Sequence, residues 1–140
     1  MREILFRGKT NFEGRESQWI YGSLLTESSN TFPIIAQDYD NDEEWIGILE
    51  WATVDPYTVG QYTGLTDKNG KRIFEGDIVN VNTKPNLLEH GYRSNHLVVR
   101  FDEYHRFVAS GRLEYPLCNH YEWEVIGNIH DNPELLKGGE

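Results

Sequence analysis

The chain has 140 residues, of which 38% are hydrophobic and 13% aromatic, and its formal net charge at pH 7 is -10. The aromatic content excludes a disordered chain, because disordered segments are poor in aromatic side chains. The acidic balance disfavours direct binding of nucleic acid, which needs clustered Lys and Arg side chains. No apolar run approaches the length of a membrane span, so we expect no membrane segment.

Cys118 is the only cysteine, so no intrachain disulfide can form, and a lone thiol suits a reducing compartment. The amino-terminal residues MREILFRGK contain no long apolar run, so we expect no secretory signal. Together these features favour a cytoplasmic protein.

The first part of the chain reads as short strands separated by polar turns. Alternating apolar residues and bulky β-formers predict three strands, namely REILFRG, QWIYGSLL and TFPIIAQ. The longest apolar segment, EEWIGILEW, is broken by charges at both ends. Pro33 belongs at the start or on the edge of the third strand, because it has no N–H to donate. The segment 53–60 contains Pro56 and Gly60 and is the candidate boundary. We therefore expect a β-rich amino-terminal region at 1–58 and a second domain at 59–140.

The stretch QYTGLTDKNGKRIFEGDIVNVN, residues 61–82, predicts a hairpin, a tight turn and a long strand. Asn69-Gly70 is the dipeptide typical of a type I′ hairpin turn, which needs positive φ at both central residues. Glu75-Gly76-Asp77 predicts the second turn, because Gly76 takes positive φ freely and Asp77 can accept nearby backbone N–H groups. Lys68, Lys71 and Arg72 keep the hairpin tip in water, and we interpret them as a solvated turn.

The rest of the chain predicts further strands in HLVVRF, HRFVAS, LEYPL and YEWEVIGNIH. DNPELLKGG predicts a short carboxy-terminal helix, with Asp131 or Asn132 as its cap and Leu135 and Leu136 turned inward. Five short strands joined by turns between about residues 72 and 130 are typical of an SH3-like barrel. The fold class is therefore mainly β, with a small β-rich amino-terminal part, an SH3-like barrel and a short final helix.

Several of these segments, taken together, resemble the YopX family of bacteriophage and prophage proteins. The matching features are REILFRG, the aromatic-Tyr-Gly of WIYGSLL, the block QYTGLTDKNGKRIFEGDIV and the closing EVIGNIHDNPELL. The resemblance implies a β-rich amino-terminal region, a carboxy-terminal SH3-like barrel and a phage gene expressed in a bacterial cytoplasm. It implies no catalytic residues.

Two segments contain residue types that bind metal ions. DYDNDEE places Asp38, Asp40, Asp42 and Glu44 at alternate positions, but an EF-hand needs Gly and Glu where this chain has Glu43 and Leu49. We therefore interpret 38–44 as a solvated acidic loop. Cys118 and His120 lie two residues apart, and a zinc site would also need ligands such as His105 and His130, whose spacing gives no support. We expect no metal and no cofactor.

Aromatic side chains are the candidate protein-binding residues. Trp45, Trp51, Tyr57, Tyr62, Tyr121 and Trp123 could line a groove of the kind by which SH3-like domains bind peptides. The competing interpretation is that the rings fill the core. For Trp123, which lies in an alternating strand, we expect the core. Tyr57, Tyr62, Trp45 and Trp51 stay open as binding residues.

Three classes of function stay open. The first is a non-enzymatic accessory protein that binds a phage or host protein and forms a homo-oligomer, because the residues predict turns and strands without a convergent chemical motif. Subunits would pack through WIGILEW, although this segment could instead pack on its own barrel in a monomer. The second is an enzyme whose site joins Cys118, His120 and a carboxylate. The third is an acidic mimic of nucleic acid that occupies a host DNA-binding protein.

Overall fold

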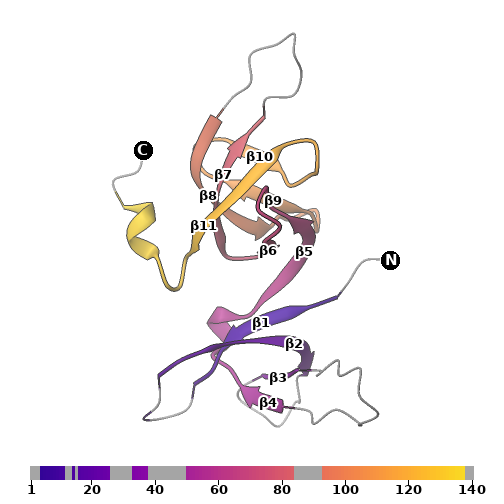
Figure 1. The fold of residues 1–140 in the computed structure, drawn as a ribbon, viewed down its shortest axis with the longest axis vertical. Coiled ribbons are helices and arrows are strands. Elements are labelled where there is room, and N and C mark those ends of the chain that lie inside the picture. Colours follow the sequence, from indigo (N-terminus) through magenta and orange to yellow (C-terminus); the bar gives the residue numbers. More distant parts are fainter. Residues whose placement is uncertain are drawn as a thin grey trace. The chain divides into compact units, whose positions relative to one another are not determined.

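The computed structural model describes residues 4–11, 14, 16–25, 33–37, 50–83 and 93–137. The chain forms two compact units, Met1–Tyr62 and Thr63–Glu140 (Figure 1). The sequence placed the boundary between residues 58 and 59, four residues before this division. The expectation of a mainly β protein is confirmed, because both sheets are antiparallel and the described helices are two 3-10 turns.

The first unit is built from short antiparallel strands in the order β4-β3-β2-β1, followed by the beginning of β5. Their bounds are β1 Phe6–Lys9, β2 Trp19–Leu25, β3 Ile34–Gln37 and β4 Glu50–Thr53. Pro33 precedes β3, as its missing N–H requires. The buried side chains of Ile20, Ile35, Ala52 and Val54 form the core of this unit.

A 3-10 turn, Pro56–Thr58, leads from β4 towards β5, Gly60–Thr66. The carboxylate of Asp55 accepts the N–H of Tyr57 at 3.0 Å and so caps this turn. The Thr58 hydroxyl accepts the Lys9 N–H at 2.8 Å, which ties the turn to β1. The candidate linker of the sequence is thus an ordered turn within the first unit.

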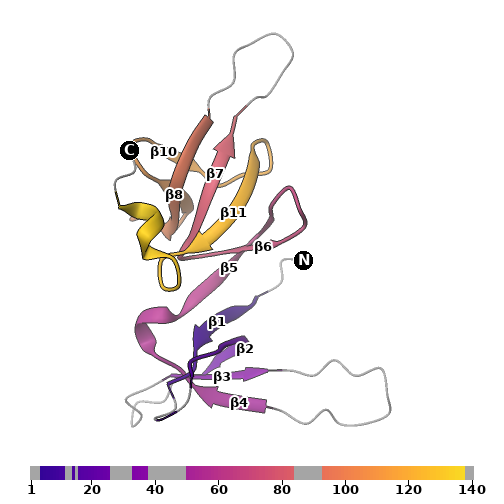
Figure 2. The same cartoon turned by 60° about the vertical axis from the view of Figure 1, so that its left-hand side comes forward.

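The second unit holds a hairpin and a five-stranded antiparallel sheet in the order β10-β9-β8-β7-β11 (Figure 2). The end of β5 and β6 form the hairpin. The bounds are β6 Arg72–Phe74, β7 Asp77–Asn82, β8 Arg93–Phe101, β9 Phe107–Ser110, β10 Glu114–Pro116 and β11 Glu122–Asn128. The sequence predicted five strands here, whereas six form, and the first pairs with β5 outside the sheet. The sheet is open, so the SH3-like barrel is not confirmed.

One face of the five-stranded sheet carries the core of the second unit. The buried side chains of this core come from β6, β7, β8, β9 and β11. They are Ile73, Val79, Val81, Leu97, Val99, Ala109 and Trp123. Trp123 is only 2% exposed, so its predicted place in the core is confirmed. Aromatic packing continues outward from Trp123 to Tyr121, with ring centroids 5.9 Å apart.

The hairpin predicted at Asn69-Gly70 forms, but the type I′ turn is wrong. Gly70 alone has positive φ, at 81°, and Asn69 does not. The N–H of Gly70 donates to the C=O of Asp67, and the N–H of Asp67 donates to the C=O of Lys71. This is a type I turn followed by a left-handed residue, the usual geometry of a three-residue hairpin loop. The second turn is confirmed, with Gly76 at φ 93° and the Asp77 carboxylate accepting the Phe74 N–H at 2.7 Å.

The predicted carboxy-terminal helix is a 3-10 turn at Pro133–Leu136. Asn132 stands at its cap position, but its side chain makes no cap bond and accepts the N–H of Asn128 instead. The expected inward packing of both leucines is wrong, because Leu136 is exposed and Leu135 only half-buried. Four residues provide too short a turn to plug the end of a sheet. No helix in the described part of the chain has the length and apolar character to cross a membrane.

Candidate functional site

The face of the second sheet opposite its core carries a ladder of polar side chains on β7 and β11. Trp123 pairs with Val81, while Glu122 pairs with Asn82 and Glu124 with Asn80. Successive side chains of a strand point to opposite faces, so burying Val81 and Trp123 directs their polar neighbours outward. The alternation in the sequences NVN and EWE therefore builds the ladder.

A β-bulge in β8 lies beside this ladder. Val79 pairs with Leu97 and Val81 with Ser94, so Asn95 and His96 together oppose the single residue Asn80. His96 has φ 60°, an unusual value for a residue other than glycine. The carboxamide oxygen of Asn80 accepts the His96 N–H at 3.0 Å and holds the bulge. Bulges are common beside binding sites because they redirect a side chain, and this one carries Asn95 to the rim of a pocket.

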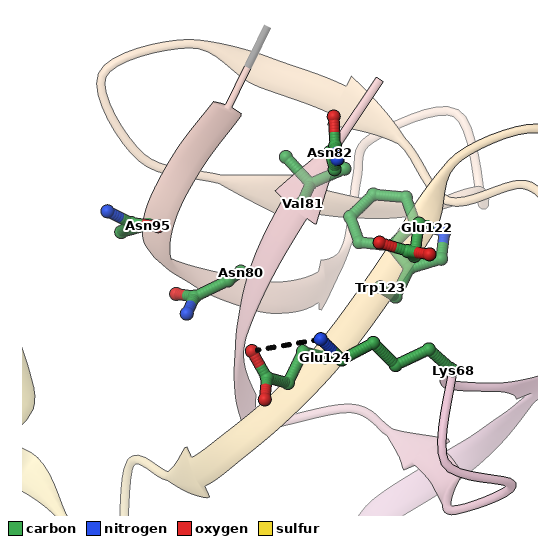
Figure 3. A pocket seen from close by; sticks show the side chains of 8 residues that line it. All are labelled: Lys68, Asn80, Val81, Asn82, Asn95, Glu122, Trp123 and Glu124. Carbon is green, nitrogen blue, oxygen red and sulfur yellow. Dashed lines mark ion pairs between the residues drawn. The ribbon is translucent and has the colours of Figure 1, made fainter. Parts of the chain in front are cut away.

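The pocket encloses about 160 Å³ between the sheet and the hairpin tip (Figure 3). Its lining residues are Lys68, Asn80, Val81, Asn82, Asn95, Glu122, Trp123 and Glu124. In Figure 3 Lys68 extends from the hairpin towards Glu124 on β11, with Nζ and Oε1 3.9 Å apart. Both side chains are more than 40% exposed, so this ion pair contributes little to stability and stays accessible to a ligand.

Asp67 fixes the hairpin tip against β11. One carboxylate oxygen accepts the N–H groups of Asn69 and Lys71, and the other accepts the N–H of Val125 at 2.9 Å. The Lys68 N–H donates to the C=O of Trp123, also at 2.9 Å. Burial alone would raise the pKa of Asp67, but the three backbone bonds and the charge of Lys71 lower it below the ordinary 3.8.

A second hollow, of about 450 Å³, lies between the hairpin, the loop that precedes β11 and the beginning of β11. Its lining residues are Leu65, Thr66, Asp67, Lys68, Cys118, Asn119, His120, Tyr121, Glu122 and Trp123. Three of them, Lys68, Glu122 and Trp123, also line the first pocket. The Cys118 C=O accepts the indole N–H of Trp123 at 2.7 Å, which anchors the loop that precedes β11. The two hollows therefore adjoin one strand, β11.

The second hollow brings Cys118 and His120 to one place, as the thiol-enzyme hypothesis requires. Two carboxylates line the hollow with them, Asp67 and Glu122, and the two oxygens of Asp67 already accept three backbone N–H groups. Asp67 is therefore engaged by the backbone, and no hydrogen bond joins Cys118 or His120 to Glu122 among the described contacts. No group of three or more His, Cys, Asp or Glu side chains within the described ranges is arranged to hold a metal ion. The acidic loop 38–44 lies outside the described residues.

The four aromatic residues proposed for binding differ in their exposure and position. Tyr57 stands in the 3-10 turn with 88% of its surface exposed, whereas Tyr62 in β5 is buried. Trp51 lies in β4, and Trp45 lies outside the described residues. Tyr57 is therefore exposed to solvent, whereas the ring of Tyr62 is buried.

The polar pocket and the hollow were not predicted from the sequence. Both depend on Lys68 meeting Trp123 across 55 positions of the chain, which no local pattern reveals. The alternation of Asn with Val in β7 and of Glu with Trp in β11 was the available signal, because it marks one polar face on each strand.

Comparison with known proteins identifies relatives of the whole chain. The family model described as YopX protein matches residues 5–137. The crystal structure of protein EF1440 from Enterococcus faecalis is similar, with a TM-score of 0.61 and 26% sequence identity. The match covers 98% of this chain and 100% of that one. Among curated proteins none matches.

Proposed function

Because the chain belongs to the YopX family, we propose that it is a phage or prophage accessory protein of the bacterial cytoplasm. In this proposal it works by binding another protein and by assembling with itself, and it catalyses no reaction. An SH3-like character of the second unit is part of the same proposal, since SH3-like domains bind extended peptides.

The observation that carries the protein-binding part is the hollow of about 450 Å³ beside β11. It is bordered by the edge of a β-strand and mixes apolar side chains such as Leu65 and Tyr121 with polar ones. Strand edges present backbone N–H and C=O groups in a row, and partner proteins use them as docking templates. Such a hollow suits a polypeptide better than a compact small molecule.

Self-assembly is supported by the edge of the first sheet. β4 ends the strand order of that sheet, and β3 is its described neighbour. The apolar residues Ile46 and Ile48 precede β4 in the sequence and lie outside the described residues. We propose that two copies associate through this part of the chain.

Light scattering at micromolar concentration tests self-assembly. We expect a mass that is a multiple of the 16.3 kDa of one chain. Ile46→Asp or Ile48→Asp should reduce it to one chain, while Leu113→Asp, at an exposed site of the second unit, should leave the oligomer unchanged. A wild-type mass near one chain contradicts self-assembly, and an oligomer insensitive to Ile46→Asp and Ile48→Asp moves the interface elsewhere.

The absence of catalysis is tested at Cys118. We expect that a broad screen of hydrolase and transferase substrates finds no turnover that the Cys118→Ala variant loses. Circular dichroism provides the control that the variant is folded. Turnover by the wild type that disappears in a folded Cys118→Ala variant would instead establish a thiol enzyme.

A further inference from the structure

The hairpin tip contacts β11 in the way that a neighbouring strand would. The Lys68 N–H donates to the Trp123 C=O at 2.9 Å, and the Asp67 carboxylate takes the Val125 N–H in place of a backbone carbonyl. Nζ of Lys68 lies 3.9 Å from the carboxylate of Glu124. Opposite charges on adjacent strands commonly pair in this manner. The hairpin tip thus occupies part of the position that a further strand would take at the outer edge of β11.

The larger hollow continues along the same edge, towards the beginning of β11. Tyr121, Glu122 and Trp123 line it on one side, and Leu65 and Thr66 of the hairpin line it on the other. In an antiparallel strand the N–H and C=O of one residue face the same side. Since the Trp123 C=O faces the hairpin tip, the Trp123 N–H also faces this outer edge.

We propose that this hollow binds an extended segment of a partner protein, which adds to β11 as one further strand. The segment carries a basic side chain beside Glu122 and directs its neighbouring apolar side chains towards Leu65 and Tyr121. This inference rests on the proposed protein-binding function and names the chemistry of the partner.

Charge selects the segment. The ammonium group of Lys68 lies beside the carboxylate of Glu124. Glu122 is the equivalent acid two residues earlier on the same face. A second copy docking its own β11 would bring glutamates against glutamates, which is unfavourable across strands. The net charge of -10 also draws basic segments to the protein and repels acidic ones. The occupant is therefore a basic, alternating strand and not a copy of β11.

Cys118 provides the reporter for the experiment, because it is the only cysteine and it lines the hollow. The probe is a blocked peptide of about seven residues, the length of a typical strand, in which Val alternates with Arg. The measurement is the rate of Cys118 alkylation by iodoacetamide in the full chain as peptide is added. We expect bound peptide to slow the alkylation, with saturation at sub-millimolar peptide.

Two matched peptides and two matched variants isolate the cause. A peptide with Glu in place of Arg, and an Arg peptide N-methylated so that it cannot pair as a strand, should not protect Cys118. Glu122→Lys should weaken the Arg peptide about fivefold, because an attractive cross-strand pair becomes a repulsive one. Glu134→Lys makes the same charge change at an exposed position outside the hollow and should leave the affinity nearly unchanged.

Each other result overturns the inference. These results are an Arg peptide that gives no protection at millimolar concentration, equal protection by the N-methylated peptide, or equal weakening by both charge variants. Failure here leaves self-assembly to be judged by light scattering alone. The proposed function itself falls if the protein is also monomeric at micromolar concentration.

Discussion

Two hairpin turns of the second unit, Asp67–Lys71 and Asp102–Arg106, follow one plan. In each, the Asp N–H donates to the C=O four residues on, and one carboxylate oxygen accepts the N–H groups two and four residues on. The three distances are 2.7, 2.8 and 2.9 Å in the first turn and 2.8, 2.9 and 2.9 Å in the second. The fourth residue of each turn has positive φ, 81° at Gly70 and 60° at His105.

The turns differ in what the second carboxylate oxygen does. In Asp67 it accepts the N–H of Val125, from a strand 58 positions away. In Asp102 it pairs with the guanidinium of Arg106 in its own turn, 2.9 Å away. The motif at Asp102 therefore only closes its own hairpin. The motif at Asp67 closes its hairpin and also joins it to β11. Local geometry alone does not determine how much a turn contributes to stability.

The largest expected effect is that of Asp67→Ala. This change removes three bonds to a charged acceptor and leaves the N–H of Val125 without its partner, so we expect a loss of about 3 kcal/mol in unfolding free energy. Asp102→Ala is the matched control and should cost less, because its second oxygen bonds only to the exposed Arg106 of its own turn. Urea denaturation of both variants measures the difference. Equal losses would mean that the bond to Val125 adds nothing.

Gly70→Val should destabilise by about 2 kcal/mol, because a β-branched residue resists positive φ. A Cβ at Gly70 meets no atom within 4 Å, so the loss would report backbone strain without a steric clash. Gly70→Asn is the control and should cost less, since Asn tolerates this region. Unchanged thermal stability of Gly70→Val would contradict the turn described here.

The reverse change in the other turn is His105→Gly. It relieves the strain of a histidine at φ 60°, although glycine loses more chain entropy on folding. We expect a net gain of at most about 1 kcal/mol, visible as a small rise in melting temperature. A clear loss would show that the His105 ring, whose centroid lies 6.3 Å from that of Phe101, contributes more than the strain costs.

The smallest expected effect is the loss of Asp67's contribution to the unfolding free energy at acidic pH. The pKa of Asp67 lies below 3.8 in the folded protein, so its stabilising contribution is present above about 3.8 and is lost as the pH falls through the folded value. The difference in unfolding free energy between wild type and Asp67→Asn should therefore shrink from about pH 4 downward. Denaturant melts between about pH 6 and pH 2 would measure it. A difference that stays constant with pH would contradict the lowered pKa.

Strand and turn positions could be predicted where the signal is local. Gly76 and Asp77 marked the second turn, and the parity of Trp123 marked the core. The type of the first turn was missed because Asn69-Gly70 outweighed Asp67, although Asp at the first position and Gly at the fourth are typical of a type I turn. His105 could have been found by the same comparison, since Asp102 and Arg106 repeat the spacing of Asp67 and Lys71.

The barrel and the candidate site required information that local patterns do not contain. Counting strands between 72 and 130 could not show that β6 pairs with β5 and leaves the remaining sheet open. The bulge at Asn95 and His96 depends on the register of β7 against β8. The hollow beside β11 depends on the position of the hairpin tip. That position is fixed by the hydrogen bond from the Val125 N–H to Asp67, between residues 58 positions apart.

The bond between Asp67 and Val125 also sets an order of events while the ribosome makes the chain. The hairpin emerges first, but the strand that occupies the second oxygen of Asp67 follows 58 residues later. At bacterial and eukaryotic elongation rates this interval is roughly 3 to 12 s. During those seconds the second carboxylate oxygen of Asp67 cannot accept the Val125 N–H. Completion of β11 is thus the step that immobilises the tip, and a nascent chain stalled before Val125 would expose an unfinished sheet to chaperones and proteases.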